Sequence, residues 1–189
     1  MRGRACRAAN LPVRPQHMHL ALIRDKAKVF PRIDNPSSYQ SARIWHCSYR
    51  TLQPVALFTK LRTLVIATYP DSSFDIIAGL VWLQALEVLH LPRITDLSPL
   101  AQLKNLRRLS LRTVPSWDGS GKATVVDSLA PIAGLPLLED LELIGVVPKI
   151  KKADDLLSSS SLKRCRVSKF PRAEQQRLHA RFVSGRGDR

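Results

Sequence analysis

Five histidines and three cysteines are the side chains of this sequence best suited to metal binding or proton transfer. The cysteines lack C-x-x-C spacing and are odd in number, which argues against a zinc site and a disulfide framework. No carboxylate stands at ligand or relay spacing from a histidine, so we expect surface histidines instead of a metal site or a general base. The residues concerned are His17, His19, His46, His90, His179, Cys6, Cys47 and Cys165.

A phosphate-binding loop is the second chemistry that the residues suggest and then exclude. Gly121-Lys122 with Thr124 is part of such a loop, but the motif G-x-x-x-x-G-K-[ST] needs glycine at Ser116 and Ser or Thr at Ala123. No Ser–His–Asp or Cys–His arrangement and no pair of pocket carboxylates can be argued. The sequence therefore predicts no enzyme, no cofactor and no small-molecule substrate.

An internal repeat dominates the sequence and must position any functional residues. Four segments of fifteen residues obey [LI]-x-[PG]-[ILV]-[AV]-x-[LF]-x-x-L-x-x-L-x-[LI] without a gap, and they begin at Leu52, Ile77, Leu97 and Leu129. A weaker copy ends at Leu162-Lys-Arg-Cys165-Arg-Val167, and a leading edge copy keeps only Ile44-Trp-His-Cys47-Ser-Tyr49. Cys47 and Cys165 occupy strand core positions in this alignment, so we expect buried, inert thiols.

Each copy combines two periodicities. Leu109 and Leu111 are two residues apart, so in a strand they point to the same face. Upstream, Leu100, Leu103 and Leu106 have helix-like spacing, and Pro99 stands where a first helical residue would be. One strand plus one helical turn cannot bury its apolar edge alone, but stacked neighbours can. The pattern predicts an α/β solenoid with a parallel sheet on the concave side and short helices or irregular segments on the convex side.

These motifs resemble the leucine-rich repeats, whose strands share L-x-x-L-x-L. The stretch Ile94-Thr-Asp-Leu-Ser-Pro-Leu-Ala-Gln-Leu-Lys-Asn-Leu is similar to the short repeats of internalin-type bacterial proteins, and the resemblance covers residues 44–168. It implies a protein-binding function. The sequence departs from the family in its spacing, because equivalent positions lie 25, 20, 32 and 24 residues apart. Apolar side chains also replace the usual asparagine or cysteine after each strand, at Tyr69, Ile94, Val114, Val146 and Phe170.

The formal net charge of +15 resides in the two ends of the chain. Residues 1–50 carry +8, residues 51–150 carry zero and residues 151–189 carry +7. We expect a disordered basic arm over 1–18, or translation from Met18. An N-terminal cap and edge strand follow over 19–50, then repeats over 51–168, then a capping helix with a basic tail over 169–189. No apolar run is long enough for a secretory signal or a membrane helix, so we expect a cytoplasmic protein without membrane contact.

The solvent face of the predicted sheet supplies the candidate binding residues. In this register Asp140 lies between Arg108 and Arg164, and Glu142 lies beside Arg166, and for these charged residues a solvated ion-pair ladder is favoured over a binding role. The predicted face residues are Thr63, Val65, Val88, His90, Arg108, Ser110, Arg112, Asp140, Glu142, Arg164 and Arg166. An insertion loop over 114–124 adds Trp117, either as a partner anchor or folded back on the convex surface.

The sequence therefore predicts a non-catalytic module that binds another protein through the concave face or the insertion loop. Binding of nucleic acid or another acidic partner through the basic termini is the alternative. It is less favoured because no aromatic residues interleave with those charges and no recognition motif is present.

Overall fold

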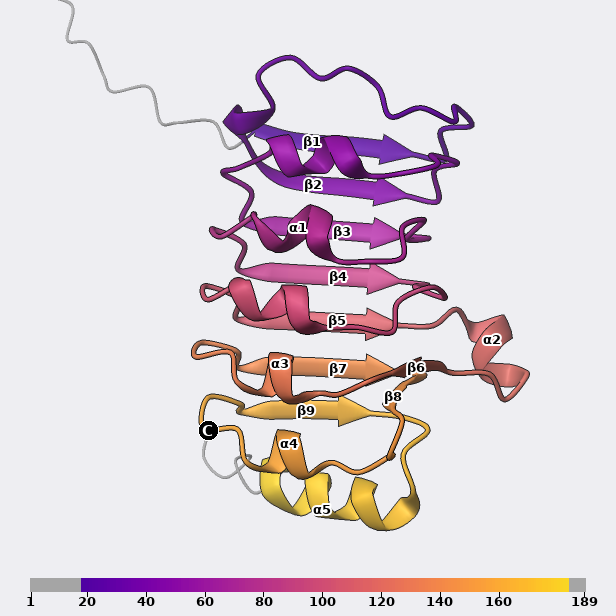
Figure 1. Ribbon diagram of the computed structural model, residues 1–189, viewed down its shortest axis with the longest axis vertical. Coiled ribbons are helices and arrows are strands. Elements are labelled where there is room, and N and C mark those ends of the chain that lie inside the picture. The colour runs from indigo at the N-terminus through magenta and orange to yellow at the C-terminus, as the bar shows by residue number, and fades with distance from the viewer. Residues whose placement is uncertain (1–17, 184–189) are drawn as a thin grey trace, which may run out of the picture.

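Seven parallel strands form one sheet whose order in space is the order in the chain (Figure 1). The computed structural model describes residues 18–183. Because each strand pairs with the next one in sequence, every unit stacks directly on its predecessor, as the repeat predicts. The strands are β1 (Met18–Ile23), β2 (Tyr39–Trp45), β3 (Thr63–Ala67), β4 (Ala85–Leu89), β5 (Arg108–Arg112), β7 (Asp140–Ile144) and β9 (Arg164–Val167).

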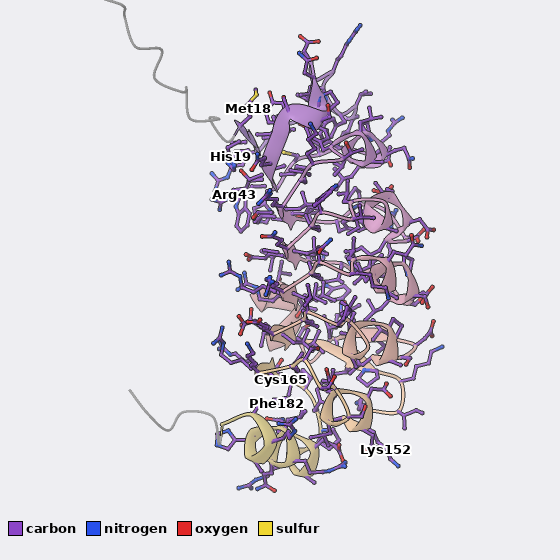
Figure 2. All side chains as sticks on the ribbon, turned by 90° about the vertical axis from the view of Figure 1, so that its left-hand side faces the viewer. Met18, His19, Arg43, Lys152, Cys165 and Phe182 are labelled. Carbon is purple, nitrogen blue, oxygen red and sulfur yellow. The ribbon has the colours of Figure 1, made fainter. Side chains whose placement is uncertain are left out.

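Short helices line one face of the sheet and leave the other open (Figures 1 and 2). Proline stands in the first turn of four of them, where its fixed φ suits a helix start and its missing N–H costs no hydrogen bond. From η2 to α4, each helix packs on its neighbours in the stack. They are η1 (Pro36–Ser38), η2 (Gln53–Leu57), α1 (Asp75–Ala78), η3 (Ser98–Gln102), α3 (Ala130–Ala133) and α4 (Asp154–Leu157).

The core lies between the sheet and these helices. Alternate strand residues such as Leu64 and Ile66 point inward and are fully buried, and Leu61 and Phe58 close the layer from the helical side. Leu109 and Leu111 do the same two units further along. Burial of these repeated side chains in each unit is the main stabilising force of the stack.

The register of β4 differs from the sequence prediction by three residues. Leu86 pairs with Leu64 and Val88 with Ile66, so the repeat copy begins at Phe74 instead of Ile77. Leucines recur every three residues at Leu80, Leu83, Leu86 and Leu89, so the motif matches equally well after a shift of one triplet. The corrected spacings from Leu52 through Phe74, Leu97, Leu129 and Ala153 are 22, 23, 32 and 24 residues.

Residues 19–50, where the sequence predicts a cap and an edge strand, hold two strands and a further copy of the repeat. Phe30, Ile33, Tyr39, Ala42 and Ile44 have the spacing of Leu52, Val55, Leu61, Leu64 and Ile66, shifted by 22 residues. Phe30 and Ile44 are buried in the common core. The sequence pattern does not detect this copy, because Pro36, Tyr39 and Ala42 stand where the next copy has Phe58, Leu61 and Leu64.

A left-handed residue follows most strands and continues the sheet ladder. His46, Thr68 and His90 have φ values of 52°, 70° and 64°. The N–H groups of Thr68 and His90 donate to the carbonyls of Leu89 and Arg112 in the next unit, at 2.7 and 2.6 Å. The turn therefore satisfies its backbone through the neighbouring unit.

The position after this left-handed residue is the one that usually holds asparagine or cysteine in the resembled repeats. It is filled by buried apolar side chains at Tyr69, Leu91, Val146 and Phe170. The three-residue register shift makes Leu91, and not Ile94, the occupant in the β4 unit. Cys47 also stands here, past the end of β2, so its predicted place in a strand core is wrong. Its thiol donates to the carbonyl of Leu22 over 3.4 Å.

The C-terminal end of the stack is covered by α5 (Arg172–Val183), which buries Leu178 and Phe182 (Figure 1). Glu174 in its first turn accepts a hydrogen bond from the Ala153 amide at 2.9 Å, which ties the helix to the last unit. The basic segments 1–17 and 184–189 lie outside the described residues.

The insertion after β5 forms α2 (Pro115–Gly119) and β6 (Thr124–Val126). β6 pairs with β8 (Val146–Pro148) in a separate two-stranded parallel sheet, and α2 projects from the side of the stack (Figure 1). The insertion therefore lies beside the C-terminal ends of the strands.

Candidate binding face

The outward side of the seven-stranded sheet is the side that the described helices leave uncovered (Figure 2). In the side view the strands lie on one side and the helices on the other, with His19 and Arg43 on the sheet side (Figure 2). We call this surface the sheet face and describe it in columns that cross the strands, with neighbouring residues about 4.8 Å apart.

Three columns form the sheet face. The first contains His19, Ser41, Thr63, Ala85, Arg108, Asp140 and Arg164. The second contains Ala21, Arg43, Val65, Glu87, Ser110, Glu142 and Arg166. The third contains Ile23, Trp45, Ala67, Leu89, Arg112 and Ile144.

The structure places nine of the predicted residues in these columns. They are Thr63, Val65, Arg108, Ser110, Arg112, Asp140, Glu142, Arg164 and Arg166. Val88 and His90 are not there, which corrects the prediction. The shifted register turns Val88 into the core, where it is fully buried, and His90 lies in the turn after β4.

The second half of the sheet face, from β5 to β9, is a lattice of ion pairs. Glu142 accepts a hydrogen bond from Ser110 at 2.8 Å and pairs with Arg166 at 3.3 Å and Arg112 at 3.7 Å. Arg112 also contacts Glu87. Exposed pairs of this kind contribute only about 0–1 kcal/mol each, so the lattice orders the side chains more than it stabilises the fold.

Asp140 lies between Arg108 and Arg164 in the register but pairs with Arg164 alone. The Nη2 atom of Arg164 lies 2.5 Å from Asp140 Oδ2, and this contact raises the pKa of the guanidinium. Arg108 is exposed and makes no ion pair within the described residues. One cation of this half therefore remains available to a partner.

The first half of the sheet face, from β1 to β4, is apolar along its third column. Ile23 is 57% exposed, Trp45 and Leu89 are half-buried, and Ala67 is covered by its larger neighbours. The guanidinium carbon of Arg43 lies 4.3 Å from the centroid of the Trp45 ring. A cation and an aromatic surface are thus presented together.

His46 and His90 border this apolar column at the C-terminal ends of the strands. His46 Nδ1 lies 3.2 Å from Thr68 Oγ1, and His90 meets the Trp117 ring edge-to-face at a centroid distance of 5.1 Å. Partial burial, and then the nearby His46, lower the pKa of His90, which keeps this imidazole neutral. Trp117 is half-buried against His90, so it lies at the strand ends and not on the convex surface.

Arg43, Trp45, Glu87 and Leu89 are among the face residues that the sequence prediction missed. A signal for the correct register is present, because Ile77-Ala-Gly-Leu80 and Ile132-Ala-Gly-Leu135 are identical tetrapeptides. Aligning them places Leu86 and Val88 under Leu141 and Leu143, as the structure does.

Within residues 18–183, no group of three or more histidine, cysteine or acidic side chains is arranged to hold a metal ion. No helix of this described part is both long and apolar enough to cross a membrane.

The stacked strand-and-helix units and their 22- to 24-residue spacing define a leucine-rich repeat solenoid of the α/β class. No protein-family model and no curated protein matches the chain. Among solved structures, internalin C2 of Listeria monocytogenes is similar with a TM-score of 0.60 and 23% identity, over 80% of this chain and 63% of that one. An internalin (inlF) of the same organism gives 0.53 and 18%, over 79% and 47%. The chain thus spans less than two thirds of either protein, and the likeness shows the fold.

Proposed function

We propose that the chain is a non-catalytic module that binds another protein through its sheet face. The observation that supports this most is the asymmetry of the solenoid. One side is closed by helices and capped by α5, while the opposite side exposes seven strands with no helix or strand of residues 18–183 over them (Figure 2). Leucine-rich repeats serve many unrelated functions, so the assignment depends on this surface and not on the fold alone.

The sheet face has the chemistry of a non-obligate protein interface. Apolar and aromatic residues in its first half adjoin an ordered polar lattice in its second half, which matches the apolar centre and polar rim of such interfaces. Trp117 in the insertion adjoins the apolar column through His90 and would extend the contact.

A pull-down from the native host with matched charge variants tests the proposal. Val65→Glu and Ser110→Glu add one carboxylate to each half of the sheet face, and Gln53→Glu and Gln102→Glu add the same charge to exposed sites on η2 and η3. We expect a specific partner to be lost with a face variant and retained with both helical controls. Retention with every face variant would contradict the proposal.

Nucleic-acid binding through the basic termini is the second candidate, and the separation of charge supports it, with +8 in residues 1–50 and +7 in residues 151–189. Such binding weakens steeply with salt because counterions are released. Filter binding of a DNA duplex at several salt concentrations would reveal it. Absence of binding at low salt removes this candidate.

A further inference from the structure

The two halves of the sheet face differ in how their charges are satisfied. From Glu87 onward, carboxylates neutralise neighbouring cations, as in the pairs Arg166–Glu142 and Lys163–Glu139, the latter at 3.2 Å. Before Glu87, no described residue takes part in an ion pair. The cations in this part are Arg24, Lys26, Lys28, Arg32, Arg43, Arg50, Lys60 and Arg62.

The four acidic residues of the same part offset only half of these cations. Asp25 is engaged by the hydroxyl of Tyr49 at 2.6 Å and by the amide of Ala27 at 2.9 Å. Asp34, Asp71 and Asp75 are the other carboxylates before Glu87, so residues 18–86 carry eight cations against four carboxylates, a formal charge of +4. The first half of the sheet face therefore lies in a positive field that the chain itself does not cancel.

A partly exposed apolar column crosses this positive region. Ile23, Trp45 and Leu89 lie in the third column, and Val65 lies beside them in the second. Four strands at about 4.8 Å spacing give the column a length of roughly 14 Å. Neighbouring apolar groups that remain in contact with water favour a partner that removes them from it.

Arg43 joins the two properties at one point. Its guanidinium stacks on Trp45, so its position is fixed before any partner arrives and less side-chain entropy is lost on binding. A carboxylate that reaches Arg43 would bring the adjacent atoms of its own chain onto the indole and onto Ile23.

We propose that the first half of the sheet face binds a protein segment in which carboxylates flank apolar side chains. The inference deepens the proposed function and rests on it. A single-stranded nucleic acid fits this surface less well, because such ligands stack their bases on several aromatic side chains. Trp45 is the single indole, phenyl or phenol ring on the face of β1–β4. The second half of the face fits less well too, because a partner there must replace ion pairs that already exist.

The test selects a random twelve-residue peptide library on the full-length protein and measures the enriched peptides on defined variants. Arg43→Gln removes the unpaired cation on β2, and Arg108→Gln is the matched control, since it removes an exposed, unpaired arginine from the other half of the same sheet. Affinities are measured by isothermal titration calorimetry, which leaves Trp45 and Trp117 in place and does not depend on the contact between Arg43 and the Trp45 ring.

We expect enriched peptides to combine Asp or Glu with Leu, Phe or Trp. The dissociation constant of such a peptide should rise about tenfold for Arg43→Gln and less than about twofold for Arg108→Gln. Ile23→Ser should weaken binding without changing its salt dependence, because it removes apolar contact only.

Other results overturn the inference in distinguishable ways. Peptides that bind through Arg108 or Arg166 would support the sheet face as the binding surface. They would refute the inference, because the binding site would then lie in the second half of the face. Peptides whose binding is weakened only by Gln53→Glu or Gln102→Glu would refute the proposed function as well. A dT20 oligonucleotide that binds more tightly than every peptide and depends on Arg43 would identify a nucleic-acid site instead. No enrichment at all would refute both.

Discussion

A Cβ atom added to Gly145 would clash with Thr113 Oγ1. These residues follow β7 and β5 at equivalent turn positions, and the Thr113 amide donates to the Ile144 carbonyl at 2.8 Å, which holds Thr113 against the next unit. Gly145 also has φ +69°. Glycine is thus required here for two independent reasons, backbone conformation and close approach.

Gly145→Ala is expected to lower the free energy of unfolding by about 2–4 kcal/mol, as left-handed strain and overpacking combine. Gly121→Ala is the control, since Gly121 has φ +78° and open space around an added Cβ. It should cost about 1 kcal/mol from strain alone. Urea denaturation measures both values, and equal losses would show that Thr113 moves aside without cost.

The corrected register of β4 predicts opposite behaviour for two adjacent residues. Val88→Ala deletes fully buried methyl groups and should cost about 2 kcal/mol. Glu87→Ala removes a half-exposed carboxylate that pairs with Arg112 and should cost less than about 1 kcal/mol. Thermal denaturation of the two variants compares them directly. A larger loss for Glu87→Ala would restore the register in which Val88 faces solvent.

β4 shows which parts of the fold can be predicted from the sequence and which cannot. The repeat, the stacking order and the inward leucines of β3, β5 and β7 follow from apolar spacing, because a period of two fixes which side of a strand is buried. In β4, leucines recur every three residues, and that spacing does not distinguish one triplet from the next.

The first half of the sheet face was less predictable for the same reason. Its columns depend on β2 and β4, whose buried positions include Ala42 and Val88 and whose face carries Trp45 and Leu89. Apolar residues on both sides of a strand remove the alternation that would identify the core. The pairing of neighbouring strands in the structure shows which residues of β2 and β4 are buried and which lie on the face.

The free energy of unfolding should depend on pH through the carboxyl group of Asp25. The hydrogen bond from Tyr49, followed by that from the Ala27 amide, lowers the pKa of this carboxyl below its usual value. A lowered folded-state pKa stabilises the fold above the unfolded pKa of about 3.9, and this contribution is lost as pH falls through the folded value. Tyr49→Phe should therefore flatten the decline of unfolding free energy between about pH 5 and 3.

Tyr69→Phe is the control for this pH dependence. Its hydroxyl donates to the Ser73 carbonyl at 2.8 Å, so the variant loses a hydrogen bond to a group that does not titrate. The acid-induced decline should match that of the wild type. Parallel curves for Tyr49→Phe and the wild type would refute the role of Asp25.

Cys165 should be chemically inert in the folded protein. Burial raises its pKa to about 12, so at pH 8 only about one molecule in ten thousand carries the thiolate that reacts. In a C6S/C47S background, iodoacetamide should modify Cys165 roughly a thousandfold more slowly than in the urea-unfolded chain. Folded and unfolded rates within tenfold of each other would show that the thiol is accessible.

Site-specific photo-crosslinking in the native host tests the central claim most directly, because it reports which surface touches a partner in place. Benzoylphenylalanine is introduced at three exposed positions: Ala21 in the first half of the sheet face, Arg166 in the second half, and Gln102 on the helical side. We expect one protein adduct that is strong from Ala21, weaker from Arg166 and absent from Gln102. An adduct as strong from Gln102 as from Ala21, or none from either position on the sheet face, would contradict it.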